Sequence, residues 1–122
     1  MATITNTGKA DVAAAIKGEF DYLALGTGTT AESAAHTALV AETTTSGLAR
    51  SAATMSTQTT TTTNDTSRAT KQWTASGSVT VGESGLLDAA SAGTMLVRDV
   101  KSPTKAVTSG DTYTNTTDIA VS

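Results

Sequence analysis

Two glycine-rich segments of this 122-residue chain have residue types that could bind an anion or activate a nucleophile. Gly26-Thr27-Gly28 follows an apolar stretch, but a phosphate-binding P-loop needs the spacing G-x-x-x-x-G-K-[ST], and no lysine follows here. Gly82-Glu83-Ser84-Gly85 resembles the start of a nucleophile elbow, but Leu86 stands where the G-x-S-x-G pattern requires its second glycine. We therefore interpret Gly26-x-Gly28 as a tight turn and expect no nucleophilic serine at Ser84.

The remaining titratable residues also give weak signals for chemistry. His36 is the only histidine, and it stands in an Ala/Thr-rich stretch without an obvious orienting acid for a Ser-His-acid triad. One histidine and no cysteine disfavour zinc. Glu83 and Asp88 could ligate a hard cation, but Asp88 is better explained as an acceptor of backbone N–H bonds in its own turn, and Arg98 can balance either acid. The sequence predicts no enzyme and no catalytic, metal-binding or cofactor-binding residue.

Two further features have both a binding and a structural interpretation. Trp73 is the only tryptophan and could anchor a partner, but in a chain with 3% aromatic residues we expect it at the centre of the core. The threonine run Thr57–Thr63, interrupted only by Gln58, has the look of an adhesive or ice-binding surface. A solvated β-edge or hairpin arm is the simpler interpretation, and it is the one that we adopt.

Composition restricts the fold and the partners. Threonine makes up about a quarter of the residues, and β-branched side chains favour pleated sheets. A net charge of −3 with only eight Lys and Arg leaves no basic stripe for phosphates, so no nucleic-acid partner is expected. No apolar run is long enough to span a bilayer and no signal peptide is evident, so we expect no membrane partner and synthesis in the cytoplasm.

The order of local signals predicts one structural domain over residues 1–122, with a short N-terminal arm, 1–7. A helix follows, capped by Asn6 or Thr7 and ended by Gly18. Residues 31–40 fit either a short helix or a loop. Strands are expected at 22–25, 48–63, 68–75, 79–81, 94–100 and after 111, with a hairpin turn at 64–67, a compact loop at 82–93, and a strand end at Lys101-Ser102-Pro103. The predicted fold class is mainly β: a β-sandwich or jelly-roll-like barrel with one short N-terminal helix.

Apolar residues of these strands and of the 82–93 loop define the predicted core. Its members are Trp73, Val79, Val81, Leu86 and Leu96. Two segments are too poor in apolar residues to be ordered by packing on their own domain, so we expect them to make intersubunit contacts. The residues expected there are Ile4, Thr5, Thr59, Thr61 and Thr63.

The stretch Trp73–Val100, WTASGSVTVGESGLLDAASAGTMLVRDV, resembles a segment of small virion proteins of tailed bacteriophages and related viruses. Those proteins carry an aromatic strand, a Glu-x-Gly-Leu-Phe-Asp-Ala-Ala-Ser-like turn, a Gly-x-Met/Leu-Leu-x-Arg strand and a later Ser-Gly-Asp turn, here Ser109-Gly110-Asp111. The likeness extends more loosely to Ile4–Ile16 and Tyr22–Thr30. Leu87 replaces the usual phenylalanine, and Lys101 replaces an apolar residue.

This resemblance implies a structural role in the virion. A capsid decoration (cement) protein, bound to the major capsid protein on the outer head surface, fits the small size and the acidity. A tail or fibre-attachment component is the alternative that the sequence leaves open, and a host-surface or carbohydrate-binding module is a third. For the two structural roles the partners are the major capsid protein or other virion proteins, and the subunit is expected to form a homo-oligomer, for which a trimer is one closed form.

Overall fold

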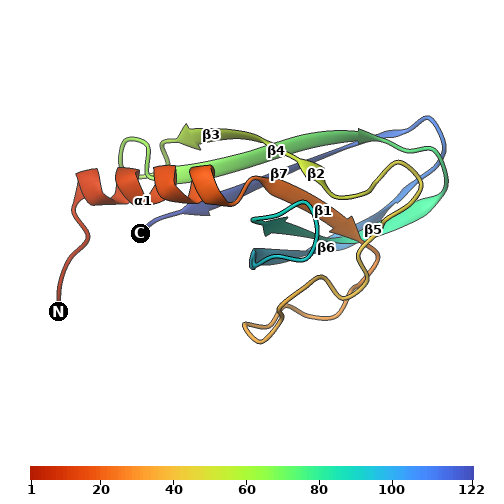
Figure 1. Ribbon diagram of the computed structural model, residues 1–122, viewed down its shortest axis with the longest axis horizontal. Helices are drawn as coiled ribbons and strands as arrows, with labels where there is room; N and C mark the ends of the chain where they lie inside the picture. The colour runs from red at the N-terminus through yellow and green to blue at the C-terminus, as the bar shows by residue number, and fades with distance from the viewer.

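Seven strands form two antiparallel sheets in the computed structural model, which describes residues 1–122. Sheet A has the strand order β2-β1-β5-β6, and sheet B has the order β3-β4-β7. The elements are α1 (Asn6–Glu19), β1 (Tyr22–Gly26), β2 (Ser51–Ala52), β3 (Thr54–Gln58), β4 (Thr66–Thr74), β5 (Val79–Leu87), β6 (Met95–Val107) and β7 (Thr112–Ala120). The mainly-β sandwich with one N-terminal helix is confirmed (Figure 1).

The helix α1 begins one or two residues earlier than the sequence suggested. The hydroxyl of Thr5, rather than Asn6 or Thr7, caps it by accepting a hydrogen bond from the Gly8 N–H at 3.0 Å. The extended arm is therefore residues 1–5, shorter than the expected 1–7, and the helix continues past Gly18 to Glu19. Ala13 is its one buried residue, because α1 packs only one face against β3 and β4.

The main core lies between the two sheets. Trp73 is 4% exposed, and Val81 and Leu86 are buried, so these three predicted core residues are confirmed. Val79 and Leu96 are only half-buried at the margin of this cluster. The volume that we expected from them comes instead from Leu23, Leu25, Leu48 and Val107.

Sheet A is covered on both faces, which gives the molecule a third layer. Leu23 and Leu25 of β1 face sheet B, whereas Ala24 between them packs with Leu39 and Leu87 in a separate small cluster. Leu39 belongs to the long segment between β1 and β2, which runs along the outer face of sheet A (Figure 1). This segment is a loop with turns, so the helical option for residues 31–40 was wrong.

The expected long strand at 48–63 is broken into two short ones. β2 pairs with β1 in sheet A, and β3 pairs with β4 in sheet B, so the chain changes sheets near Ala53. Residues 59–65 then form a loop instead of continuing the strand, and β4 begins at Thr66. A threonine run has β-propensity throughout, but only residues that find a partner strand join a ladder.

The prediction of a compact loop at 82–93 was also wrong for its first half. Residues 82–87 belong to β5, which pairs with β1 on one side and β6 on the other. β6 continues through Pro103 to Val107, beyond the predicted stop. The β5–β6 register shifts between Val81 and Glu83, and an edge strand tolerates proline at such an irregularity because no ladder bond is lost.

Candidate functional site

A fully buried glutamate organises the outer face of sheet A. Glu83 on β5 is 0% exposed, and its carboxylate accepts backbone N–H bonds from Gly28 (2.8 Å), Val40 (2.9 Å) and Ala41 (2.8 Å). Arg98 on β6 donates to the same carboxylate from its Nε at 2.8 Å. One side chain thus ties both ends of the segment 28–41 to the sheet.

The electrostatics of Glu83 show how this burial is tolerated. Burial alone would raise the pKa of the Glu83 carboxyl, but the hydrogen bonds from Arg98 and from the backbone of Ala41, Val40 and Gly28 outweigh it and lower the pKa overall. The charged form is therefore the stable form. An anion with four donors needs no proton, and it serves here as a structural ligand for the loop.

The lack of side chains in the Gly26-x-Gly28 motif leaves room for the Glu83 carboxylate close to the backbone. A Cβ built on Gly26 would lie 2.6 Å from Glu83 Oε2, and one on Gly28 would clash with the same oxygen. Gly82 is equally constrained, because its Cβ would lie 2.8 Å from the Gly28 carbonyl oxygen. The motif cradles an anion, as phosphate loops do, but the anion belongs to the protein itself.

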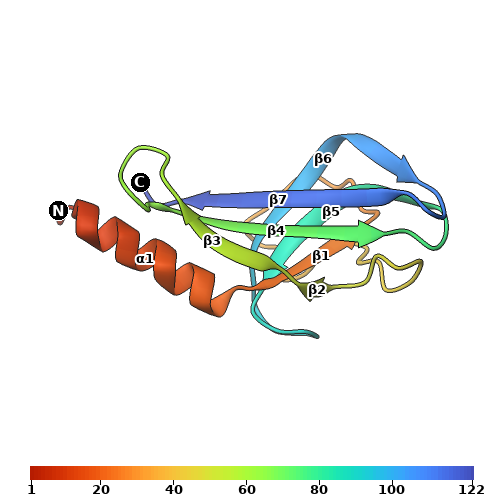
Figure 2. The same ribbon diagram turned by 90° about the horizontal axis from the view of Figure 1, so that it is seen from above.

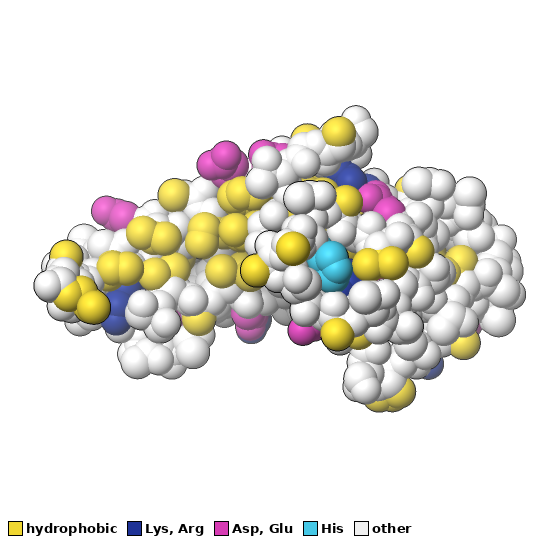
Figure 3. Space-filling view, turned by 90° about the horizontal axis from the view of Figure 1, so that it is seen from below, with side chains coloured by type: hydrophobic (Ala, Val, Ile, Leu, Met, Phe, Trp, Pro, Cys, Tyr) yellow, Lys and Arg dark blue, Asp and Glu magenta, His cyan; other side chains and the backbone are white.

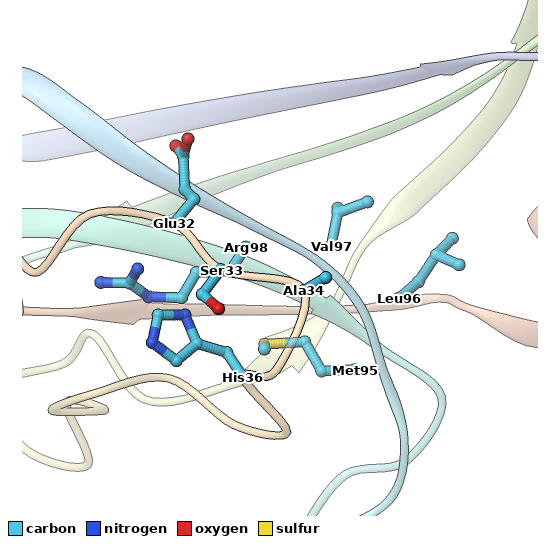
Figure 4. Close-up of a pocket in the computed structure, with 8 residues that line it drawn as sticks. All are labelled: Glu32, Ser33, Ala34, His36, Met95, Leu96, Val97 and Arg98. Carbon is cyan, nitrogen blue, oxygen red and sulfur yellow. The ribbon is translucent and has the colours of Figure 1, made fainter.

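Arg98 links this buried centre to the surface. Its side chain is 3% exposed, its Nη1 donates to the Thr30 carbonyl at 2.8 Å, and its Nη2 is buried without a protein partner. A hollow of about 360 Å³ lies beside it, lined by Glu32, Ser33, Ala34, His36, Met95, Leu96, Val97 and Arg98 (Figure 4). The hollow lies between residues 32–36 of the loop and residues 95–98 of β6.

The residues in this hollow are not arranged as a catalytic triad. The Ser33 hydroxyl accepts from the Ala35 N–H at 3.1 Å, and the Glu32 carboxylate accepts from the Val100 N–H at 2.7 Å. The His36 ring lies beside the Arg98 guanidinium, and its Nδ1 is buried without a partner (Figure 4). Ser33 and Glu32 thus hold the loop in place, and neither is hydrogen-bonded to the imidazole.

A second arginine fixes the neighbouring loop. Arg50 pairs with Glu42 at 2.7 Å and donates from Nη1 to the carbonyls of Ala89 and Ala92 at 3.0 and 2.8 Å. Within that loop, Asp88 accepts the Thr94 N–H at 2.7 Å, which confirms its predicted role in its own turn. Glu83 and Asp88 therefore serve separate purposes, and no group of three or more His, Cys, Asp or Glu side chains could hold a metal ion.

The threonine-rich segment is a loop closed by an aspartate. Asp65 is 2% exposed, and its carboxylate accepts the N–H groups of Thr60, Thr61 and Thr62 at 2.8 to 3.0 Å. These backbone bonds, first those of Thr62 and Thr60, lower the pKa of Asp65 well below its ordinary value. The loop is therefore ordered from within. Of the β-edge or hairpin arm that we expected for Thr57–Thr63, Thr57 and Gln58 belong to the edge strand β3, and residues 59–63 lie in the loop that joins β3 and β4 into a hairpin. Thr59, Thr61 and Thr63 are all exposed on it.

The structure brings the two segments predicted to make subunit contacts to the same end of the molecule. The start of α1 and the loop between β3 and β4 lie at one end of the ribbon (Figure 2). A groove of about 330 Å³ lies between them, lined by Asn6, Thr7, Ala10, Thr62, Thr63 and Asn64. Ile4 in the arm is 47% exposed and Met1 is fully exposed, whereas Thr5 is engaged as the helix cap. Hydrophobic side chains continue along the exposed face of α1, where Val12 is 42% exposed (Figure 3).

Comparisons with known proteins add no family assignment. No protein-family model matches the chain, and a search of curated proteins finds no match. The structure contains no helix with the length and apolarity needed to cross a membrane.

Proposed function

We propose that this chain is a structural virion protein of a tailed phage, and specifically a capsid decoration protein that binds the outer head surface and stabilises the shell. The resemblance of Trp73–Asp111 to small virion proteins motivates the proposal. The net charge of −3 suits the outside of the shell better than its DNA-facing inside. The expected partner is the major capsid protein or another virion protein, with no nucleic acid and no membrane.

The observation that carries the proposal is the shared position of the arm and the threonine-rich loop. Exposed Met1 and Ile4 lie in the arm before α1, and exposed Thr61 and Thr63 lie in the loop at the same end of the molecule (Figure 1). The two exposed apolar side chains of the arm and the hydroxyls of the loop offer both burial and hydrogen bonding to a neighbouring protein. Many identical contacts of this kind on a lattice add up to a large stabilisation of the shell.

The use of the buried polar groups favours a structural over a catalytic role. Glu83, Arg98 and Asp65 each form hydrogen bonds that hold a loop in place. Such fixed ion pairs and turns suit a rigid particle component. We accordingly propose that the chain is not an enzyme.

The test uses purified virions in which the wild-type gene is replaced. Deleting Ala2–Ile4 removes the arm and retains Thr5 as the helix cap. The deletion and Ile4→Ser should both yield folded protein that binds heads with much lower occupancy, measured by quantitative gel electrophoresis of head fractions. Val40→Ser is the matched control, because Val40 is 48% exposed, like Ile4 at 47%, but lies on the loop over sheet A.

Three outcomes would count against the proposal. Full occupancy of the truncated protein on heads would show that the arm is not the anchor. Equal loss of binding in the Val40 control would place the contact elsewhere. Recovery of the wild-type protein only in tail fractions, at a few to a few dozen copies, would replace the decoration role with the tail or fibre role.

A further inference from the structure

The free edge of β7 is the least protected strand edge in the molecule. β2 has two residues and β3 has five, and α1 packs against β3. The edge strand β6 carries Lys101, Pro103 and Lys105, which discourage pairing. β7 is nine residues long, forms one side of sheet B, and contains neither lysine nor proline (Figure 2).

The backbone groups that β7 directs to this edge can be identified from its ends. The Val121 N–H donates to the Asp65 carbonyl at 2.9 Å, and the Asp111 carbonyl accepts from the Ala75 N–H at 2.7 Å. Both bonds point toward β4. Because successive residues of a strand direct their N–H and C=O groups to opposite edges, the even-numbered residues of β7 direct theirs outward. These are Thr112, Thr114, Thr116, Asp118 and Ala120.

A groove beside this edge exposes part of the core. It has a volume of about 310 Å³ and is lined by Val97, Asp99, Thr116, Thr117, Asp118 and Ile119. Val97, Tyr113 and Ile119 pack on the main core but remain only half-buried. The edge thus combines unpaired backbone groups with apolar side chains that a neighbour could cover.

We infer that β7 pairs antiparallel with β7 of a second copy of this chain, about a two-fold axis at Thr116. In this register Thr116 faces its own copy, Thr114 faces Asp118, and Thr112 faces Ala120. All of these residues direct their backbone groups outward, so each facing pair exchanges two hydrogen bonds. The two three-stranded sheets become one six-stranded sheet.

The side chains favour this register over its neighbours. On the groove side it places Tyr113 against Ile119 of the other copy and Asn115 against Thr117, in the closely spaced pairs where side chains contact best. Asp118 is the only charge on β7, and the two copies of it lie about 13 Å apart, beyond the screening length at physiological salt. Moving the axis to Asn115 would place Ile119 opposite Asp111, and moving it to Thr117 would bring the two Asp118 side chains closer together.

This inference goes beyond the proposed function, because it concerns the isolated protein and does not need a particle. A two-fold dimer would stand in place of the trimer that the sequence suggested. The dimer leaves the arm and the threonine-rich loop free, so one dimer would present two copies of the proposed particle-binding end. Loss of dimerisation and loss of head binding can therefore be measured separately.

The first test is sedimentation velocity of the full-length chain at several concentrations. The wild type should sediment as a dimer. Thr116→Pro should be monomeric with an unchanged circular dichroism spectrum, because the Thr116 N–H is directed away from β4 and proline there breaks only the pairing between copies. A wild-type protein that is monomeric at all concentrations, or an oligomer that Thr116→Pro leaves intact, would overturn the inference.

The second test is a cysteine crosslink, which remains informative if the proline variant unfolds. The chain has no cysteine, so any disulfide comes from the introduced residue. Thr116→Cys should form a covalent dimer under mild oxidation, because facing residues at the axis have Cα atoms about 5.5 Å apart, within disulfide range. Thr70→Cys is the matched control, since Thr70 pairs with Thr116 within sheet B but lies one strand from the edge. Equal crosslinking of the two variants would contradict the inference.

Discussion

Glu83 and Arg98 lie diagonally across the β5–β6 pair, with Glu83 Oε1 2.8 Å from Arg98 Nε. Glu83 faces Val100 in the register and Arg98 faces Gly85, so both side chains are on the same face of sheet A. Their side chains are 0% and 3% exposed. A buried pair of this kind holds the structure together only while both partners are present.

Replacing Glu83 with Gln should destabilise the protein by roughly 3–5 kcal/mol, because the Arg98 charge stays buried without its partner. Chemical denaturation measures this loss. Hydrogen exchange should also show faster opening at the Val40 and Ala41 amides, which lose their charged acceptor. Glu32→Gln is the control, since exposed Glu32 lies on the same loop and accepts one N–H, that of Val100 in β6; its replacement should cost about 1 kcal/mol. Combining Glu83→Gln with Arg98→Met should recover part of the lost stability. A loss of unfolding free energy in the double variant that exceeds the sum of the two single losses would contradict the role of Glu83 and Arg98 as a buried ion pair.

Two glycine substitutions should act in opposite directions. Gly28→Ala should destabilise the protein, because the new Cβ would collide with Glu83 Oε2 and would lie 2.8 Å from Val40 Cβ. Gly18→Ala meets nothing within 4 Å on the helix α1 and should stabilise by roughly 0.5–1 kcal/mol. Melting temperatures of the two variants give the comparison. Equal effects of the same sign would show that the close approach of Gly28 to Glu83 is not the reason for glycine there.

Trp73→Ala should cost roughly 3–5 kcal/mol, because it opens a cavity between the two sheets. It also removes the indole N–H bond to the Ala49 carbonyl, which measures 2.9 Å. Trp73→Phe keeps most of the volume and should show a smaller loss, which includes the missing hydrogen bond at about 1 kcal/mol. A Trp73→Ala protein with an unchanged melting temperature would mean that the side chain serves a partner and not the core.

Asp65 should make the protein sensitive to acid. Its folded pKa is lowered from the ordinary value of 3.8, so its contribution is complete above that pH and is lost as pH falls toward the lower folded pKa. Asp65→Asn should therefore flatten the fall of unfolding free energy below about pH 4. Urea titrations between pH 2 and pH 7 measure the profile.

Added salt should affect the Asp65 carboxylate less than the exposed ion pair Arg68–Asp118. Arg68 lowers the pKa of Asp118 too, but the Asp118 side chain is 42% exposed. Salt should therefore screen the contribution of this ion pair to stability. The contribution of Asp65 to the free energy of unfolding comes from backbone N–H bonds and should persist at 1 M salt. A wild-type profile that high salt flattens as much as Asp65→Asn does would contradict this assignment.

Local sequence signals determined the elements that depend on near neighbours. The alanine-rich run 10–16 has high helix propensity, and it forms α1. The short apolar run Tyr22–Leu25 forms β1, and the alternation at Tyr113, Thr117 and Ile119 forms β7 with these side chains on one face. The place of Trp73 in the core also followed, because a chain poor in aromatic residues has no other group of that size.

The tertiary structure alone decided what Glu83 does. Gly82, Ser84 and Gly85 around it are typical of a turn, and the sequence therefore predicted a compact loop in which Arg98 could balance either Glu83 or Asp88. The segment is a strand because β1 and β6 pair with it on both sides. Its glutamate can be buried only because Gly28, Val40 and Arg98, between 15 and 55 residues away in the chain, supply donors for its charge. The desolvation of a charge is offset by partners in space, and their positions are fixed only once the sheets have formed.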